Sequence, residues 1–202
     1  MARLQLNKSS LARESRELQR FQRFLPSLEL KRQQLMLEKA SVVQAAEELG
    51  AKLDDIFNEV KQQLPMLSHQ DIDLENLVAT PQVCIKQENV LGVHLPCVAE
   101  IRHQNVDYNL LARPHWVDNY VELMRAAIDV RINLEIQAEK NRILTSAIKT
   151  ITQRVNLFEK VLIPQAKENI KRIRIYLSDE QMTAVVRSKI AKGKRVAQGV
   201  TE

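Results

Sequence analysis

Length, composition and charge narrow the class of protein. The chain has 202 residues, of which 4% are aromatic and only four are glycine, while 27% are charged. With many Leu, Ala, Glu, Lys and Gln residues, this composition favours long helices, including coiled coils, over a compact fold rich in turns. The net charge of +5 suits an acidic partner such as nucleic acid, anionic lipid or an acidic protein surface. It suits a solvated basic helix face at least as well.

The first third of the chain predicts one long helix over residues 10–62. Apolar residues alternate there at steps of three and four, which is the signature of a coiled coil. One seam comprises Leu4, Leu11, Leu18, Leu25, Arg32, Lys39, Ala46, Leu53 and Val60. The other seam comprises Phe21, Leu28, Leu35, Val42, Leu49 and Ile56. The polar positions Arg32 and Lys39 interrupt the first seam, and such positions usually fix the register or face a further partner. Asn7, Ser9 and Ser10 are capping candidates, and Pro65 follows the helix.

Residues 63–113 have a different spacing of apolar residues and should connect two helices. The stretch "PQVCIKQENVLGVHLPCVAEI", residues 81–101, alternates β-branched and polar residues around a turn candidate, Gly92. Pro81 and Pro96 lie in this stretch, and proline typically interrupts regular elements. This pattern predicts a β-hairpin flanked by loops or short helices.

A second long helix is predicted over residues 114–190, followed by a frayed basic tail, 191–202. Pro114 suits its first turn, and Gln137 and Asn141 interrupt its apolar stripe midway. Pro164 lies inside it, where proline removes an amide donor at a cost of roughly 3 kcal/mol. Beyond Pro164 the stripe continues with an extra four-residue step.

Two helices joined by one connection pack antiparallel. Pairing Gln62 with His115 at the turn places Ser10 opposite Lys167. The first helix should then run out near Pro164 and leave the rest of the second helix without a partner, although a simple kink also fits the spacing. The predicted fold is all-α: a long antiparallel two-helix coiled-coil hairpin with a small β-hairpin in the central connection, forming a single elongated domain over residues 1–202.

No motif in the sequence indicates catalysis. A Gly-rich phosphate loop, H-E-x-x-H and G-x-S-x-G are all absent. His94 and Cys97 have a possible metal-ligand spacing, with Cys84 and His103 nearby, but structural zinc needs four ligands in two close pairs. The same residues fit the faces of a hairpin. We therefore expect no catalytic residue, no cofactor and no metal in this chain.

Sequence features also predict the location. The two cysteines do not make a disulfide framework and favour a reducing, cytoplasmic compartment. The amino terminus "MARLQLNKSS" lacks the apolar core of a signal peptide. No apolar run reaches the ~20 residues that span a bilayer. We expect a cytoplasmic protein that meets a membrane only through its partners.

One stretch carries a family resemblance. "QRVNLFEKVLIPQAKENIKRI", residues 153–173, resembles the R-V-N-x-x-E-x-x-x-I-P-x-x-x-x-x-I-x-x-I segment of the D subunit, the central rotor shaft of V-type and archaeal A-type ATPases. The matching residues are Arg154, Val155, Asn156, Glu159, Ile163, Pro164, Ile170 and Ile173. "NKSSL" near the amino terminus and "GVHLP" in the centre resemble two further family segments. The resemblance covers nearly the whole chain, whereas the tail "SDEQMTAVVRSKIAK" departs from the family pattern.

This resemblance implies a function and a set of partners. The D subunits of this family form a helical hairpin whose terminal ends enter a hexamer of catalytic and regulatory nucleotide-binding subunits. The middle of the hairpin points to a socket subunit above the membrane ring, and a small companion, the F subunit, clasps it. The implied role is a non-catalytic rotor that transmits torque between ATP hydrolysis or synthesis and transport of protons or sodium ions. A basic coiled coil that binds nucleic acid, or a scaffold, is the alternative, although no nucleic-acid recognition motif supports it.

Two sets of partner contacts follow as hypotheses. Polar seam residues should bind the companion subunit, because a partner satisfies polar groups that a dry seam cannot. These residues are Arg32, Lys39, Gln137 and Asn141. An apolar and basic stripe beyond Pro164 should bind the catalytic hexamer. That stripe comprises Ile170, Ile173, Leu177, Lys171 and Arg174.

Overall fold

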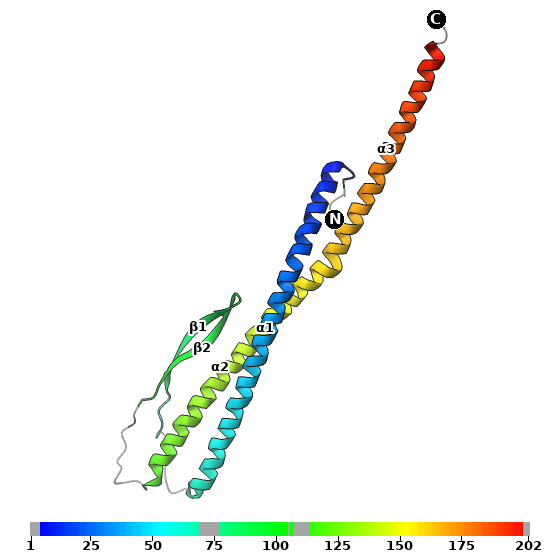
Figure 1. The fold of residues 1–202 in the computed structure, drawn as a ribbon. Coiled ribbons are helices and arrows are strands. Elements are labelled where there is room, and N and C mark those ends of the chain that lie inside the picture. The colour runs from blue at the N-terminus through cyan, green and yellow to red at the C-terminus, as the bar shows by residue number, and fades with distance from the viewer. Residues whose placement is uncertain (1–4, 69–76, 105, 107–113, 200–202) are drawn as a thin grey trace. The chain divides into compact units, whose positions relative to one another are not determined.

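The computed structural model describes residues 5–68, 77–104, 106 and 114–199 (Figure 1). In chain order its elements are helix α1 (Lys8–Gln63), the 3-10 helix η1 (Pro65–Ser68), strands β1 (Gln82–Val90) and β2 (Val93–Arg102), helix α2 (Trp116–Leu157), the π-helical turn η3 (Phe158–Leu162) and helix α3 (Ile163–Gly199). The predicted fold class is therefore confirmed: long helices with a two-stranded antiparallel sheet in the middle of the chain.

Helix α1 begins where the capping candidates predicted. The Asn7 side-chain oxygen accepts a hydrogen bond of 2.7 Å from the backbone N–H of Ser10, which satisfies one of the amide donors left open at a helix start. The helix then continues for 56 residues through Pro26. The expected boundaries, 10 and 62, differ from the observed ones by no more than two residues.

The chain divides into two compact units. One comprises residues 1–30 and 151–202, and the other comprises residues 31–150. We call them the terminal unit and the central unit and describe each by itself. The expectation of a single elongated domain stays a prediction.

In the central unit α1 and α2 run antiparallel. Leu35, Val42 and Leu144 are buried along this pair, and the first two are expected seam positions. Where the helices meet the connection, the Asn119 amide donates a hydrogen bond of 2.8 Å to the Gln63 side-chain oxygen. A small apolar cluster closes the same end, formed by Leu77, Val117 and Val121 with Val78, Trp116 and Tyr120 packed against it.

Strands β1 and β2 form the predicted hairpin. They pair antiparallel from Gln82 opposite Arg102 to Val90 opposite Val93. Gly92 has a positive φ of 79° in the turn, a conformation that glycine adopts without steric cost. The side-chain oxygen of Asn89 accepts a hydrogen bond of 2.8 Å from the backbone N–H of Gly92, so the turn is closed locally.

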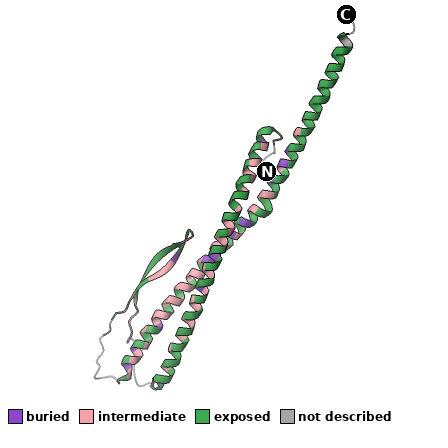
Figure 2. Cartoon of the chain, in the orientation of Figure 1, coloured by how far each residue is buried: buried purple, intermediate pink, exposed green. Residues whose placement is uncertain are grey.

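In the terminal unit the first part of α1 lies antiparallel beside α3 (Figure 1). The rings of Phe21 and Phe158 meet edge to face, with their centroids 5.4 Å apart, a geometry that aromatic pairs favour. Ile170 and Ile173 on α3 are buried, and purple segments, which mark buried residues, lie on the stretch of α3 beside α1 (Figure 2). By contrast, the described side chains over residues 178–196 are all exposed.

The π-helical turn η3 explains the extra step in the apolar stripe. The backbone N–H of Ile163 bonds to the carbonyl of Phe158, five residues back, so this turn holds one residue more than an α-helical turn. Pro164 follows directly. The turn and the proline together account for the change of phase in the otherwise helical pattern.

Two sequence-based expectations about this helix are wrong. The second helix does not lose its partner at Pro164, because Ala166, Ile170 and Ile173 are buried beyond it. The helix also does not end near residue 190, since α3 continues through Gly193 to Gly199. The tail carries enough helix-forming residues to outweigh a single glycine, which costs about 1 kcal/mol relative to alanine.

Candidate partner-binding surfaces

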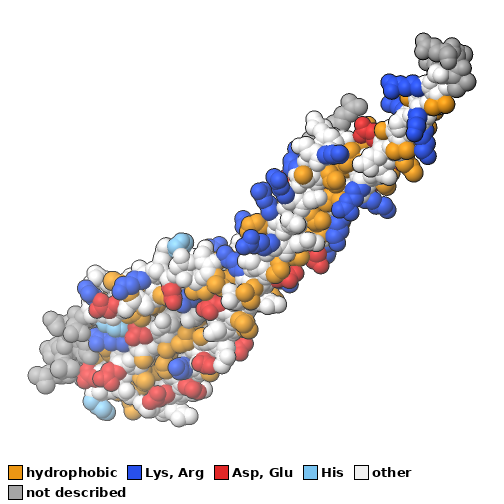
Figure 3. Space-filling model, turned by 45° about the horizontal axis from the view of Figure 1, so that its top comes forward, with side chains coloured by type: hydrophobic (Ala, Val, Ile, Leu, Met, Phe, Trp, Pro, Cys, Tyr) orange, Lys and Arg blue, Asp and Glu red, His pale blue; other side chains and the backbone are white. Residues whose placement is uncertain are grey.

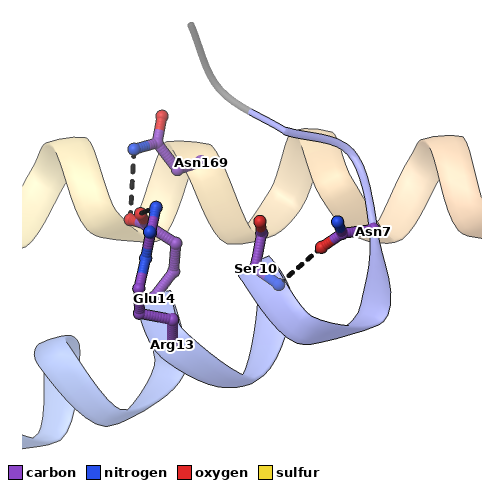
Figure 4. Close-up of polar contacts among 5 residues, drawn as sticks. All are labelled: Asn7, Ser10, Arg13, Glu14 and Asn169. Carbon is purple, nitrogen blue, oxygen red and sulfur yellow. Dashed lines mark hydrogen bonds and ion pairs between the residues drawn. The ribbon is translucent and has the colours of Figure 1, made fainter. Parts of the chain in front are cut away.

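A polar contact lies between α1 and α3 near the amino terminus (Figure 4). Glu14 is only 8% exposed, and its carboxylate accepts a hydrogen bond of 3.2 Å from the Asn169 amide. The Arg13 guanidinium lies 3.8 Å from the same carboxylate. Because a buried carboxylate needs a donor, this contact favours one register of the two helices over its neighbours.

A groove with a basic rim runs beside this contact on the α1–α3 pair. Its volume is about 550 Å³. Its lining comprises Ser15, Leu18, Gln19 and Gln22 from α1, and Lys167, Ile170, Lys171, Arg174 and Ile175 from α3. We call it the basic groove. Lys and Arg side chains gather along α3 with hydrophobic side chains between them (Figure 3).

The residues expected to meet the catalytic hexamer divide into two groups. Ile170 and Ile173 are 7% and 0% exposed because they pack within the chain. The prediction that they form an unpartnered apolar stripe is therefore wrong. Lys171 and Arg174 are exposed and line the basic groove, and Leu177 is half-buried. The last three keep side-chain surface for a partner, and hexamer binding by this set stays a prediction.

A second groove lies between α1 and α2 in the central unit. Its volume is about 550 Å³. Its lining comprises Val42, Val43, Ala46, Glu47, Arg131, Leu134, Glu135, Gln137, Ala138 and Asn141. We call it the middle groove. Its lining combines apolar side chains with the charged side chains of Glu47, Arg131 and Glu135 and the amides of Gln137 and Asn141.

Two of the four residues expected to bind the companion subunit line the middle groove, namely Gln137 and Asn141. The side-chain oxygen of Gln137 is buried without a hydrogen-bond partner in the described part of the chain. Lys39 lines a neighbouring hollow with Met36. Arg32 is half-buried and is not part of either lining. The structure thus brings Gln137 and Asn141 together and leaves Arg32 apart.

Charge is arranged locally beside the middle groove. The Arg142 guanidinium donates two hydrogen bonds to the Glu139 carboxylate, at 2.7 and 2.8 Å. These bonds lower the pKa of Glu139 and raise the pKa of Arg142. Both groups therefore stay charged at physiological pH.

The family-motif residues surround the π-helical turn. Val155 is buried in the seam, and Ile163 is half-buried. Arg154, Asn156, Glu159 and Pro164 are exposed. The motif therefore combines a packing position with polar surface.

The hairpin residues considered for a metal do not converge. His94 is exposed, and the Cys97 thiol donates a hydrogen bond of 3.2 Å to Glu88. His103 pairs instead with Asp129 on α2, at 2.7 Å between Nε2 and Oδ1. Within residues 5–68, 77–104, 106 and 114–199, no group of three or more His, Cys, Asp or Glu side chains could hold a metal ion.

The sequence interpretation missed how the basic groove is assembled. It identified the charges of α3 but not the α1 side of the groove, Ser15, Gln19 and Gln22. The available signal was the spacing of Lys167, Lys171 and Arg174, which puts three cations on one helical face.

Among the described residues, no helix has both the length and the apolar character to cross a membrane.

Comparison with known proteins places this arrangement in a family. The profile of the ATP synthase D subunit family matches residues 10–193. The V-type ATP synthase D subunit of Borreliella burgdorferi is 34% identical over 196 residues, covering 97% of this chain and 96% of that protein. Proteins of the same name from Chlamydia abortus and Chlamydia caviae are 32% and 31% identical, each covering 96% of this chain and 94% of the relative. The suspected resemblance is confirmed, and this chain belongs to the ATP synthase D subunit family.

Proposed function

We propose that this chain is the central-stalk rotor subunit of a V-type rotary ATPase. In this role it transmits torque between nucleotide chemistry in a catalytic hexamer and ion transport through a membrane ring. The observation that carries the proposal is the match to the D subunit family along residues 10–193. The chain itself is proposed to be non-catalytic, with ATP bound by the surrounding subunits.

The helices supply what a shaft needs. At 1.5 Å per residue the 56 residues of α1 span ~84 Å. A helix pair joined along a packed seam resists bending and twisting better than a single helix, because seam side chains interlock. Buried residues such as Leu35, Leu144 and Ile173, each 0% exposed, provide such interlocking within each unit.

The middle groove is the proposed contact for the companion subunit. Its polar members, Gln137 and Asn141, lie beside apolar floor residues, and the Gln137 oxygen lacks a partner among the described residues. A companion that covers the groove would bury its apolar residues and hydrogen-bond to polar side chains at its surface such as Asn141. The expected sign is a rise in the melting temperature on adding the companion. Unchanged melting would contradict the contact.

The exposed end of α3 is the proposed contact for the catalytic hexamer, together with Lys171, Arg174 and Leu177. Exposed apolar side chains continue along it, among them Met182, at 65% exposed, and Ile190, at 55%. A helix that exposes such side chains gains stability by burying them on a partner.

Truncation tests the rotor assignment. A chain ending at Leu177 keeps every buried side chain of α3 and should still fold and bind the companion. It should insert weakly into the hexamer and lower coupled ATP hydrolysis. A chain ending at Ser188 is the graded control, with a smaller loss of coupling. Both forms are reconstituted with the hexamer and the companion, and binding and ATP hydrolysis are measured. If the shorter chain assembles and turns over like the full chain, the rotor assignment of α3 is wrong.

A further inference from the structure

The β-hairpin turns one of its two strands away from the rest of the central unit. On β2, Leu95 is 2% exposed, and residues 96–98 that follow it are half-buried. On β1, by contrast, only Val83 and Val90 are half-buried, and every other residue is exposed. Strand β2 therefore lies toward the rest of the unit, and β1 forms the outer edge of the hairpin.

Pro96 shows which backbone groups of β1 point outward. Pro96 lies opposite Gln87 in the register of the hairpin, and proline has no N–H to donate to a strand ladder. These two residues therefore form a non-hydrogen-bonded pair, whose backbone groups point away from the neighbouring strand. Because such pairs alternate with bonded pairs, the N–H and C=O groups of Ile85, Gln87 and Asn89 face the outer edge of β1.

These outward groups are open to a further strand. Ile85, Gln87 and Asn89 are all exposed. Apart from the β1–β2 ladder itself, none of the backbone hydrogen bonds among the described residues involves β1. The side chain of Asn89 bonds back to the turn at Gly92 and so leaves the outer edge uncovered. An incoming chain can therefore reach the free backbone donors and acceptors.

The two edges of the hairpin differ in how they are protected. Sheet edges are commonly blocked against further pairing by proline and by bulges. The edge of β2 has both, namely Pro96 and a bulge at Ala99, which has no partner in the β1 register. Along β1, residues 85–90 pair without interruption and contain no proline. The hairpin is thus closed to pairing at β2 and open at β1.

Charge on β1 defines the partner further. Lys86 is exposed and has no ion-pair partner within the described residues. Nearby charges are engaged within the hairpin, since Glu88 accepts a hydrogen bond from Cys97 and Arg102 pairs with Glu100. A strand beside β1 is therefore complementary when it places a carboxylate next to Lys86.

From this geometry we infer that the outer edge of β1 binds an extended segment of another subunit, which adds a third strand to the hairpin. The segment places a β-branched side chain beside Ile85, which is 56% exposed, and a carboxylate beside Lys86 on the opposite face. Backbone hydrogen bonds along the edge give such a contact its affinity. A third strand also strengthens a two-stranded sheet, which is only marginally stable by itself. The inference rests on the proposed function, because the partner belongs to the same complex.

Amide hydrogen exchange at single residues tests the edge in the full chain, free and assembled with the other purified subunits. In the free chain the N–H groups of Gln87 and Asn89 should exchange fast, whereas those of Lys86 and Glu88, which face β2, should exchange slowly. On assembly the exchange of Gln87 and Asn89 should slow by at least about tenfold. The inward pair should remain slow in both states.

A matched pair of variants at Gln87 separates backbone from side-chain effects. Proline at this position removes an outward N–H and leaves the β1–β2 ladder intact, because Pro96 already occupies the facing position. Gln87→Val changes the same side chain but keeps the N–H. In the assembled complex Gln87→Pro should cost Asn89 most of its protection, and Gln87→Val should retain it. Circular dichroism melting confirms that both variants fold.

Each outcome decides a different point. If the chain does not assemble with the other subunits, the proposed function itself fails. If it assembles but Gln87 and Asn89 exchange as fast as in the free chain, or Gln87→Pro keeps the protection of Asn89, only the edge inference is overturned. Protection already present in the free chain also overturns it. A second copy is then the occupant if protection rises with concentration, and a segment of this chain if it does not.

A photo-crosslinking amino acid at Gln87 identifies the segment in the assembled complex. The substitution keeps the backbone N–H, so the edge stays available. The expected product joins this chain to an extended segment of another subunit that carries a carboxylate. Crosslinks only to helical peptides would show that a helix covers β1, and the inference of a third strand would be refuted.

Discussion

Replacing Ile173 with alanine tests whether α1 and α3 pack together beyond Pro164. Ile173 is 0% exposed, whereas Ile175, two residues later on the same helix, is 53% exposed. Ile173→Ala and Ile175→Ala remove the same atoms, so any difference between them measures burial. If α3 had no partner here, both substitutions would be equally harmless.

The burial sets the magnitude. Truncating a buried isoleucine to alanine costs roughly 2–5 kcal/mol. Because a two-helix seam closes over a cavity more readily than a deep core, the lower end, about 2 kcal/mol, is expected for Ile173. At the exposed Ile175 the change should stay within ~0.5 kcal/mol. A difference of this size alters the opening equilibrium of the helix pair by roughly tenfold or more.

Amide hydrogen exchange of the full chain is the suitable assay, because it reports opening of one region without requiring global unfolding. Ile173→Ala should accelerate exchange over residues 8–30 and 163–177, while residues 31–63 keep wild-type rates. Ile175→Ala should leave both regions unchanged. Equal exchange in the two variants would show that α1 does not cover Ile173 in solution, and the packing argument would be refuted.

Three further predictions concern polar contacts and the proline. Asn169→Leu leaves the Glu14 carboxylate without its amide donor and should lower the free energy of unfolding in urea by about 1–3 kcal/mol. Adding Glu14→Leu should restore most of the lost stability. A double variant as unstable as the single variant would show that the two residues are not coupled. Asp129→Ala removes the carboxylate that hydrogen-bonds to His103 and should speed amide exchange in β2 by a few-fold, whereas unchanged exchange would mean that this hydrogen bond does not hold the strand. Pro164→Ala restores an amide donor inside the helix and should stabilise the chain by about 1–3 kcal/mol in thermal melting; a lower melting temperature would contradict this reading of the proline.

The helices were predictable from the sequence because their apolar pattern repeats over many turns. Steps of three and four recur over many turns, and tertiary packing reinforces this pattern when the stripe is buried. Leu35 and Val42, both assigned to the second seam, are buried in the structure. The hairpin was also predictable, because glycine at a turn between alternating strands is a local signal.

The register was harder to predict, because it depends on how the connection closes. The sequence-based alignment places Gln62 opposite His115, whereas Gln63 hydrogen-bonds to Asn119, about one helical turn later. The same direction of shift recurs near the amino terminus, where Glu14 contacts Asn169. Periodicity fixes which face of a helix is buried, but it does not fix which turn of the partner lies opposite.

The grooves could not be predicted, because they form on the flanks of the seam. Lys171 and Arg174 were identified as partner candidates from their charge. Their common hollow with Gln19 and Gln22 arises only once the α1–α3 register is set. The burial of Ile170 and Ile173 depends on the same register. The sequence alone therefore did not show that these residues are covered by α1.

Pro164 and the π-helical turn connect these observations. In an α-helix this proline would leave the carbonyl of Lys160 without its donor. Here the hydrogen bonds are already rearranged one step earlier, because the Ile163 N–H bonds to the Phe158 carbonyl. The extra residue in the turn rotates the face that α3 presents, so that Ile173 meets α1 and Arg174 faces the basic groove. Since the family-motif residues surround this turn, the motif acts first on geometry: it sets the angular position of every charged side chain that follows it on α3.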